Sequence, residues 1–540
     1  MRLVTILRGA IIVLFFLSTL WLVAGLPVIF NSPDENANFV FAQTFSETGR
    51  FKIFELANRD LGGLLGPRSA VAIDNTLVPK SFFGFPLIAS VVSFIFNPSA
   101  MLYLTPVLAV LVVLAWRSLL HKVFDDNRLA DLTALFLLIH PAFWYYTGRT
   151  MMHNVAFLAF LIFGAWFFVV RPWQKLFSNS VLDALFAGLM IGFAIATRTS
   201  EVIWVMALTI FLFWYARSTI KRRQVAIFFV ALALTLVPFA LINESHYGNF
   251  WLTGYTVPEA ASDLPLAVQI PPEQIDQADF PGALTGGLGY IFPFGFHEMN
   301  IIHNVWNYGF LLYPWMSGLA LLGITLAFIK RKRPWIMLSS VTIILGAWLG
   351  IVYGSWWFTD NPDPTIVSLG NSHVRYWLPL FLLASLFTAQ SVIWIGNHIR
   401  YRALQTSVVL VIATGMIALS GWLVFLGQDG FVQTRDNLII FDEKRQAVLA
   451  STEEDAIIVV DRADKFLFPD RRVVVPLRSE RTYGSMPAML EVAPLYYFGL
   501  TLPEEDLAFL NDFKLAEMDL RIEPIEIVFD ETLYQITPIE

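Results

Sequence analysis

The chain has no cysteine among its 540 residues, and only 15% of its residues are charged. The first absence excludes disulfide bonds, thiolate nucleophiles and thiolate metal ligands. The second is unusual, because a soluble globular protein carries about 25% charged residues. A formal net charge of −7 gives no reason to expect a nucleic-acid partner. The chain is instead strongly apolar, with 56% hydrophobic residues and a mean hydropathy of +0.61.

Long apolar runs recur from Leu3 to Leu426 and predict an all-α polytopic membrane helix bundle. The first run follows Arg2 and Arg8 but has no small-residue cleavage site before Asn31, so we expect a retained helix and not a signal peptide. We expect about eleven spans, at residues 9–30, 100–120, 129–147, 155–171, 181–199, 200–216, 225–243, 304–329, 334–353, 376–396 and 404–426.

One further apolar segment, Ser81–Phe96, decides the predicted topology. It falls short of the ~20 residues that a helix needs to cross a bilayer. If it lies at the interface, the positive-inside rule holds at every cationic cluster, and if it crosses, every cluster faces outward. The clusters are Arg117/Lys122/Arg128, Arg171/Lys175, Arg217/Lys221/Arg222/Arg223, Lys330/Arg331/Lys332/Arg333 and Arg400/Arg402. We therefore predict a multi-pass protein of the plasma or inner membrane with a cytoplasmic N-terminus.

This topology predicts two domains. Residues 1–426 form the transmembrane domain, whose outer loops are 31–99, 244–303 and 354–375, with interfacial helices in the first loop. Residues 427–540 form an extracytoplasmic domain. Its β-branched runs at Ala456–Val460 and Arg472–Pro476, and a hairpin pattern at Ile525–Phe529 and Tyr534–Pro538, indicate a small soluble α/β fold.

An acidic pair, Asp34-Glu35, follows the first span directly after Pro33. One interpretation is a helix start, since Pro33-Asp34 precedes apolar periodic residues. The other is functional. An amphipathic stretch, Asn36–Thr48, is expected to lie along the membrane surface, and Lys80 stands just before the short apolar segment. A carboxylate and an amine in one outer loop suit a substrate with an anionic head and an apolar tail.

Further polar residues fall on the same predicted face. Arg149 and His153 lie between two spans, where they are either snorkelling groups or binding residues. Arg198 and Glu201 have the i,i+3 spacing of a private ion pair, although ionisable residues at such depth are functional by default.

The sequence Asn371-Ser-His373-Val-Arg375-Tyr376 precedes a predicted span. Arg375 there has the chemistry to clamp a phosphate, and Tyr376 alone is an ordinary interfacial aromatic. No cluster of metal ligands stands out, so the sequence requires no cofactor and does not support a divalent metal.

Together these residues resemble GT-C-type integral membrane glycosyltransferases, among them the dolichyl-phosphate-mannose–protein mannosyltransferases and the bacterial lipid A aminoarabinose transferase. The resemblance covers about residues 1–426. It rests on the acidic pair after the first span, Lys80 before the interfacial helix, Ala196-Thr-Arg198 after the fifth span, the turn Tyr247–Tyr255, and Arg375-Tyr376-Trp377-Leu378-Pro379. The chain departs from the family where Asn36-Ala37-Asn38 precede the first aromatic, and where His153-Asn154 replace an acidic residue.

The resemblance implies an inverting transfer of a sugar from a polyprenyl-phosphate donor to a hydroxyl acceptor, which is an unknown glycan, lipid or protein. Asp34 is then the base, and Glu35 orients the site or binds the acceptor. Lys80, Arg198 and Arg375 neutralise the departing phosphate. The remaining candidate substrate-binding residues are Arg149, His153, Tyr255, His373 and Tyr376. One base suffices, because a phosphate leaves without a general acid.

Three alternatives stay open. An oligosaccharide or polymer transferase would take a larger lipid-linked donor. A lipid or sugar transporter would place polar residues and broken helices at mid-membrane depth, within internal repeats. A non-catalytic assembly or sensor protein would use the tail to bind a ligand.

Overall fold

The computed structural model describes residues 2–177, 180–215, 217, 220–256, 292–358, 360–361, 363 and 365–539. Residues 257–291 of the predicted outer loop 244–303 therefore lie outside the described residues. The chain divides into two compact units. The first comprises Met1–Leu22, Thr105–Val237 and Asp263–Gln433, and the second comprises Val23–Leu104, Pro238–Ser262 and Thr434–Glu540.

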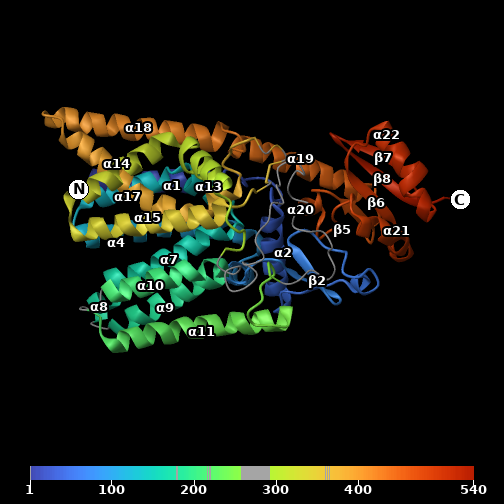
Figure 1. The fold of residues 1–540 in the computed structure, drawn as a ribbon, viewed down its shortest axis with the longest axis horizontal. Helices are drawn as coiled ribbons and strands as arrows, with labels where there is room; N and C mark the ends of the chain where they lie inside the picture. The colour runs from blue at the N-terminus through green and yellow to red at the C-terminus, as the bar shows by residue number, and fades with distance from the viewer. Residues whose placement is uncertain are drawn as a thin grey trace. The chain divides into compact units, whose positions relative to one another are not determined.

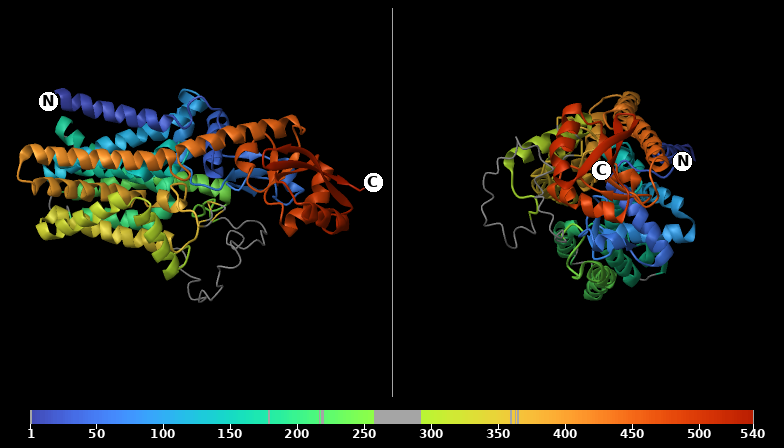
Figure 2. Two further views of the ribbon diagram at one scale, coloured as in Figure 1. Left: turned by 90° about the horizontal axis from the view of Figure 1, so that it is seen from above. Right: turned by 90° about the vertical axis from the view of Figure 1, so that its right-hand side faces the viewer.

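The first unit is a bundle of long helices, which lie side by side with their axes aligned (Figures 1 and 2). Its elements are α1 (Arg2–Leu20), α4 (Leu104–Phe124), α5 (Asn127–Leu138), α6 (Pro141–Gly148), α7 (His153–Val170), α8 (Pro172–Phe177), α9 (Ser180–Thr197), η3 (Thr199–Glu201), α10 (Val202–Tyr215), α11 (Arg222–Tyr247), α13 (Glu298–Asn304), the π-helical η6 (Val305–Leu311), α14 (Pro314–Lys330), α15 (Arg333–Gly354), α16 (Ser372–Tyr376), α17 (Leu378–Asn397) and α18 (Arg402–Leu426).

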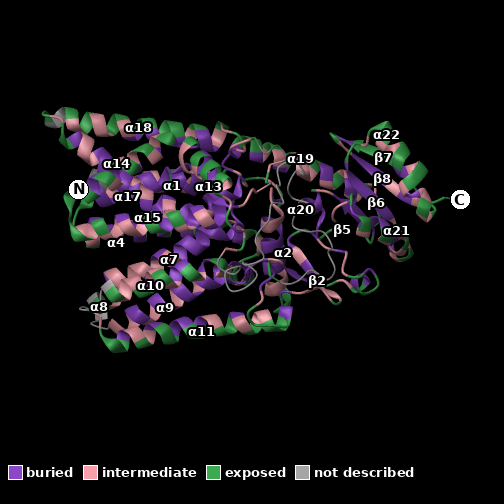
Figure 3. Ribbon diagram, in the orientation of Figure 1, coloured by how far each residue is buried: buried purple, intermediate pink, exposed green. Residues whose placement is uncertain are grey.

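Within the described residues, seven helices are long and apolar enough to cross a membrane, and nine if each of two bent pairs is one span. Exposed residues run along the outward faces of the bundle (Figure 3). The exposed residues of these helices include large apolar ones such as Leu14, Leu234, Ile344 and Val411. Such faces suit a lipid environment, where a helix satisfies its own backbone hydrogen bonds. The predicted polytopic helix bundle is confirmed.

Three predicted spans differ from the helices that form. The segment 129–147 is bent by 55° where α6 begins at Pro141, and the segment 304–329 is bent by 99° where α14 begins at Pro314. Proline lacks an amide hydrogen and disfavours helical geometry in the residue before it, so each helix restarts at its proline. The first helix, α1, ends at Leu20 and not near residue 30.

The N-terminal part of the second unit holds α2 (Pro33–Thr48), β1 (Ile53–Phe54), η1 (Leu56–Arg59), β2 (Ala70–Ile73), β3 (Thr76–Pro79), α3 (Gly84–Ile95) and η2 (Pro98–Tyr103). The strands form an antiparallel sheet in the order β1-β3-β2. The predicted interfacial segment Ser81–Phe96 forms α3, whose 12 residues rise about 18 Å, well short of a ~30 Å hydrocarbon core.

The helix α2 differs from the amphipathic surface helix that the sequence predicts. Its residues from Glu35 to Ala42 are all buried, so more than two turns are covered on every side. The helix packs against α3 and α20 within this unit. Two of the buried residues, Asn36 and Asn38, are polar. Their burial is possible because each has a hydrogen-bond partner, the carbonyl of Phe468 for Asn36 and the hydroxyl of Ser81 for Asn38.

The tail supplies the rest of the second unit. After α19 (Phe431–Ala450) come β4 (Ile457–Val460), α20 (Asp464–Leu467), β5 (Arg472–Val474), α21 (Glu480–Val492), β6 (Leu495–Leu500), α22 (Glu504–Phe509), η7 (Leu510–Lys514), η8 (Ala516–Met518), β7 (Leu520–Val528) and β8 (Glu531–Pro538).

Five of these strands form one sheet in the order β5-β4-β6-β8-β7. The first three run parallel, and β7 and β8 form the predicted antiparallel hairpin. The small C-terminal α/β fold is thus confirmed. Its hydrophobic core also takes in Ala57, Leu61 and Leu65 from the N-terminal part of the unit.

We predict that Gly323→Ala destabilises the bundle. A Cβ atom at Gly323 on α14 would lie 2.0 Å from the carbonyl oxygen of Phe387 on α17. The two helices must separate, at a cost of about 1–3 kcal/mol. A lower melting temperature in detergent is the expected measurement. Gly318→Ala on the same helix is the matched control, since nothing lies within 4 Å of its added atom. Equal melting temperatures for the two variants would contradict this packing.

Candidate functional site

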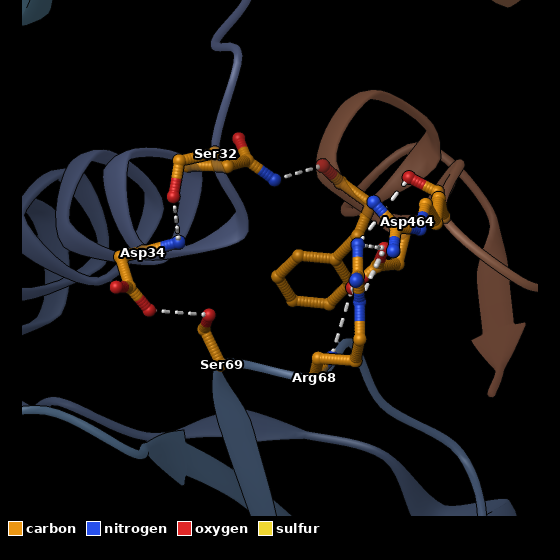
Figure 4. Close-up of polar contacts among 8 residues, drawn as sticks. Ser32, Asp34, Arg68, Ser69 and Asp464 are labelled. Atoms are coloured by element: carbon orange, nitrogen blue, oxygen red, sulfur yellow. Dashed lines mark hydrogen bonds and ion pairs between the residues drawn. The ribbon is translucent and has the colours of Figure 1, made fainter. Parts of the chain in front are cut away.

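The acidic pair stands in the first turn of α2. The helix begins at Pro33, as its sequence predicts, but the capping oxygen belongs to Ser32, whose Oγ accepts from the backbone N–H of Asp34 at 3.3 Å. The Asp34 carboxylate instead accepts a hydrogen bond from Ser69 Oγ at 3.0 Å (Figure 4). The partial positive charge of a helix N-terminus favours the anionic form of a carboxylate placed there. Glu35, next along the chain, is buried.

The hairpin of β2 and β3 places Lys80 beside Ser69, the residue that donates a hydrogen bond to Asp34. Ser69 precedes β2 and Lys80 follows β3, and the backbone N–H of Lys80 donates to the carbonyl of Ser69 at 2.8 Å. Antiparallel pairing of Ala70 with Pro79 continues this register. The structure therefore brings Asp34 and Lys80 to the same end of one hairpin, although 46 positions in the sequence separate them.

An ion pair between the exposed Arg68 and the buried Asp464 fixes the turn that carries Ser69. Asp464, fully buried at the start of α20, accepts from the backbone N–H of Arg68 at 2.9 Å and from its Nη2 at 2.7 Å (Figure 4). Nearby, Asn36 Nδ2 donates to the carbonyl of Phe468 at 2.8 Å. One short segment of the tail thus holds both α2 and the turn before β2. A bidentate pair of this kind adds geometric specificity as well as energy.

The turn from Tyr247 to Tyr255 packs on the Lys80 segment. Tyr247 Oη donates to the carbonyl of Pro79 at 2.6 Å, and the ring of Tyr255 lies 5.3 Å from that of Phe82. A Cβ atom at Gly254 would lie 2.5 Å from the Cα of Lys80. Glycine is therefore needed here for a close backbone approach.

The other candidate residues lie in the first unit, where Arg198 forms the predicted pair with Glu201. Its Nε and Nη2 donate to Glu201 Oε1 at 3.1 and 2.6 Å, and Nη2 also donates to Tyr353 Oη at 2.9 Å. Trp204 Nε1 donates to the other oxygen of Glu201. Among the described residues, Nη1 of Arg198 has no hydrogen-bond partner. A buried, unsatisfied N–H of a cation is costly and is filled in most sites by a ligand or by water.

Tyr376 joins two of the arginines. Its ring centroid lies 4.6 Å from the guanidinium carbon of Arg198 and 5.2 Å from that of Arg375. Arg375 Nη2 donates to Ser372 Oγ at 2.9 Å, and Ser372 in turn donates from its backbone N–H to Asp360 at 2.7 Å. The first turn of the short helix α16 is thereby tied to Asp360, and Arg375 is tied to that turn.

Arg149 completes a cationic cluster, which we define as Arg149, Arg198 and Arg375, and His153 lies beside it. The exposed fractions of the three arginines are 5%, 3% and 9%, and that of His153 is 4%. Arg149 Nη1 donates to Tyr145 Oη at 3.0 Å, and His153 interacts electrostatically with both Arg198 and Arg375. The burial of three guanidinium groups in a membrane bundle has a large desolvation free energy, and ionisable residues in such positions mark functional sites.

His373 has a different environment. Its ring stacks on Tyr308 at 4.9 Å, with hydrogen-bond contacts from Nδ1 to Asn371 Oδ1 at 2.7 Å and from Nε2 to the carbonyl of Trp356 at 3.2 Å. Burial lowers the pKa of His373 to about 3, so its imidazole is neutral at physiological pH. It serves as a polar group and adds no charge to the cluster.

Sequence reasoning missed four residues that position these groups. Ser69, Arg68 and Asp464 act together on Asp34, but no pattern connects positions 68 and 464 in the chain. Tyr353 lies at the end of a predicted span, where aromatic residues are common. Nothing in the sequence therefore indicates its hydrogen bond with Arg198. Within the described residues, no group of three or more His, Asp or Glu side chains is placed to hold a metal ion.

These features define a polytopic membrane protein with a buried cationic cluster in its bundle and an acidic residue held beside a lysine in its other unit. The fold matches that of ArnT from Cupriavidus metallidurans. The structure of ArnT bound to undecaprenyl phosphate aligns with a TM-score of 0.55 at 12% identity, over 98% of this chain and 97% of that one. The apo structure aligns with a TM-score of 0.56 at 13% identity, with the same coverage.

At this identity the similarity establishes the fold. The shared fold extends over nearly the whole chain, and not only over residues 1–426, where the sequence resembles GT-C-type enzymes. No protein-family model matches the sequence, and no curated protein matches it.

We predict that Gly254→Ala displaces Lys80. The added methyl group overlaps the backbone at Pro79 and Lys80, so a loss of about 1–3 kcal/mol is expected. The measurements are melting temperature and amide hydrogen exchange over residues 77–82, which should speed up. Gly484→Ala in the same unit has open space around its Cβ and should leave both unchanged. Wild-type rates of amide hydrogen exchange at residues 77–82 in Gly254→Ala would show that the Tyr247–Tyr255 turn does not hold Lys80 in place.

Proposed function

We propose that this protein is an inverting glycosyltransferase, which moves a sugar from a polyprenyl-phosphate donor to a hydroxyl acceptor on the extracytoplasmic face of the membrane. The observation that carries the proposal is the cationic cluster, with its three buried guanidinium groups and the unsatisfied Nη1 of Arg198. Arginine forks match the geometry of phosphate oxygens. The bound undecaprenyl phosphate of the similarly folded ArnT supports a lipid phosphate as the anion.

In this proposal the arginines stabilise the departing phosphate. Arg198 and Arg375 are both held over the ring of Tyr376. Fixed positions of this kind need little reorganisation as negative charge develops on the leaving oxygen. Glu201 pairs with Arg198 and balances part of the positive charge. Lys80 is assigned a second contact to the lipid phosphate.

Asp34 is the proposed base. The acceptor oxygen attacks the anomeric carbon, the bond from that carbon to the phosphate oxygen breaks, and its electron pair leaves with polyprenyl phosphate. The acceptor proton passes to the Asp34 carboxylate, which Ser69 holds in place. Glu35 orients this part of the site or binds the acceptor. A single displacement of this kind inverts the anomeric configuration, and it needs one base and no general acid.

The proposed orientation follows from α3. The shortness of α3, together with the positive-inside rule, supports an orientation in which the N-terminus is cytoplasmic and the C-terminal sheet is extracytoplasmic, together with Asp34 and Lys80. A donor presented from the outer leaflet then reaches the same side as its acceptor.

The direct test supplies purified protein with a panel of polyprenyl-phosphate sugars and acceptor extracts, and follows release of polyprenyl phosphate by mass spectrometry. Release with one or more monosaccharide donors is the expected result. Release only with oligosaccharide donors would favour the polymer transferase. Movement of intact donor across proteoliposomes without any release would identify a transporter.

We predict that Asp34→Asn lowers turnover by at least 10³-fold, since the amide cannot accept the acceptor proton. Donor binding and melting temperature should be unchanged, because the amide oxygen can still accept from Ser69. Glu47→Gln, at the exposed end of the same helix, is the control and should retain full activity. Turnover of Asp34→Asn within tenfold of the wild type would remove this residue from the base role.

We predict that Arg375→Gln weakens binding of undecaprenyl phosphate by roughly 10- to 100-fold, since a hydrogen bond to a charged group contributes about 1.5–3 kcal/mol. Arg375→Lys should recover part of this loss, because it restores the charge but not the fork. Arg223→Gln, an exposed residue on α11, should bind normally. Unchanged affinity in Arg375→Gln, measured by titration in nanodiscs, would contradict the phosphate assignment.

A further inference from the structure

Asp360 lies in the loop between α15 and α16 of the first unit, and both of its carboxylate oxygens bond to the first residue of α16. Oδ2 accepts from the backbone N–H of Ser372 at 2.7 Å, and Oδ1 accepts from the hydroxyl of Ser372 at 3.1 Å. Asp360 is exposed, whereas Ser372 is buried. A carboxylate at the surface of the unit is therefore bonded to a buried residue of the bundle.

The hydroxyl of Ser372 connects Asp360 to Arg375. Its oxygen accepts from Arg375 Nη2 at 2.9 Å. A serine hydroxyl has one proton and two lone pairs, and an ionised carboxylate only accepts hydrogen bonds. The hydroxyl proton therefore points to Asp360, and a lone pair of Ser372 remains for the guanidinium group. We call this arrangement the Asp360–Ser372–Arg375 chain.

The helix that carries Arg375 needs such contacts because it is short. With five residues, α16 is far below the length at which a helix is stable by itself. Asp360 accepts from the N–H of Ser372, and the side chain of Asn371 accepts from that of His373 at 3.0 Å. These bonds satisfy N–H groups that the start of a helix leaves without partners. Asp360 thus contributes both to the helix and to the side chain that the helix presents.

The bond to Ser372 sets the direction of the Arg375 fork. Arg375 Nη1 also contacts the sulfur of Met152 at 3.0 Å, and the guanidinium carbon lies 5.2 Å from the ring centroid of Tyr376. A thioether is a weak acceptor, and attraction to the face of a ring depends little on where the N–H groups point. A guanidinium has five N–H donors, so one bond to a hydroxyl orients the group without using all of them.

We infer that Asp360 is a positioning residue for the transfer reaction, which orients Arg375 through Ser372 for the phosphate of the donor. The inference rests on the proposed function, because it concerns a phosphate-binding arginine of that reaction. Donors that are held in place stabilise developing charge with little reorganisation. In this role Asp360 acts through Ser372 and makes no contact of its own with the substrate.

The charge of Asp360 would by itself have the opposite effect. A carboxylate two hydrogen bonds away from Arg375 repels an anion that binds there. If charge were the whole influence of Asp360, its removal would tighten the binding of a lipid phosphate. Loss of the Asp360–Ser372–Arg375 chain weakens this binding instead, so the direction of the change separates the two effects.

The test measures binding of undecaprenyl phosphate in nanodiscs by Asp360→Asn and by Ser372→Ala. Each variant should bind about three- to tenfold more weakly, the change expected from one hydrogen bond. An asparagine has one acceptor oxygen and cannot accept from both groups of Ser372 as the carboxylate does. Asp363→Asn is the matched control, because this exposed carboxylate of the same loop binds Thr365 instead, and its affinity should be unchanged.

A double-mutant cycle separates positioning from a general effect on the fold. In the Arg375→Gln background, Asp360→Asn should cause no further loss, because no guanidinium remains to be oriented. A purely structural contact would lower the affinity by the same factor in both backgrounds. Equal losses in both backgrounds, or unchanged or tighter binding in Asp360→Asn alone, would overturn the inference.

The inference and the proposed function fail in different ways. If the wild type binds the lipid and Asp360→Asn binds it equally well, the positioning role alone is wrong. If the wild type neither binds undecaprenyl phosphate nor converts a donor, the proposed function is wrong, and Arg375 is followed by its modification with phenylglyoxal in peptide mass spectrometry. Faster modification in Asp360→Asn than in the wild type and Asp363→Asn would support the positioning contact, and equal rates would overturn it.

Discussion

The cost of burying positive charge in a membrane bundle is the constraint on which the rest of the first unit depends. Three guanidinium groups lie almost fully covered, and each needs a fixed polar neighbour to remain there. Arg198 obtains one from Glu201, which is itself held by Tyr353 and Trp204. Stability alone does not explain this arrangement, because apolar residues of the same volume would stabilise the bundle at least as well. It fits the anion-binding role that is proposed for these arginines.

The same constraint explains why broken helices surround the cluster. Arg198 stands between α9 and η3, Arg149 caps α6, and Arg375 lies on the short α16. A continuous helix directs its polar side chains around its own axis, whereas a break allows one to turn into a shared interior. Irregular backbone at membrane depth is tolerated where it is buried in protein or lines a cavity.

Much of the fold follows from the sequence, because long apolar runs and alternating β-branched residues are local patterns. The predicted hairpin near residues 525–538 forms as the antiparallel pair of β7 and β8. The positions where helices end or bend are harder to predict, because they depend less on local sequence patterns. Pro141 and Pro314 break predicted spans, although proline within an apolar run is also compatible with a kinked but continuous helix.

The candidate residues could be found from their type and position, but their partners could not. The spacing of Arg198 and Glu201 predicts their pair, since both belong to one turn. The position of Ser69 beside Asp34 depends on a loop that folds against a distant element, and single residues in loops carry no periodicity. The burial of α2 could not be predicted either. Asn36 and Asn38 are typical of a solvent-facing surface, and their hydrogen-bond partners come from distant parts of the chain.

The pairing of Arg68 with Asp464 has a consequence for how this chain can change over evolutionary time. The sheet at the C-terminus looks like a separable module, yet its core includes Leu61 and Leu65, and its α20 fixes the loop that presents Asp34. An exchange of the tail between homologous proteins would therefore have to carry residues 55–69 with it. The two segments are expected to diverge together as one inherited unit, however far apart they lie along the chain.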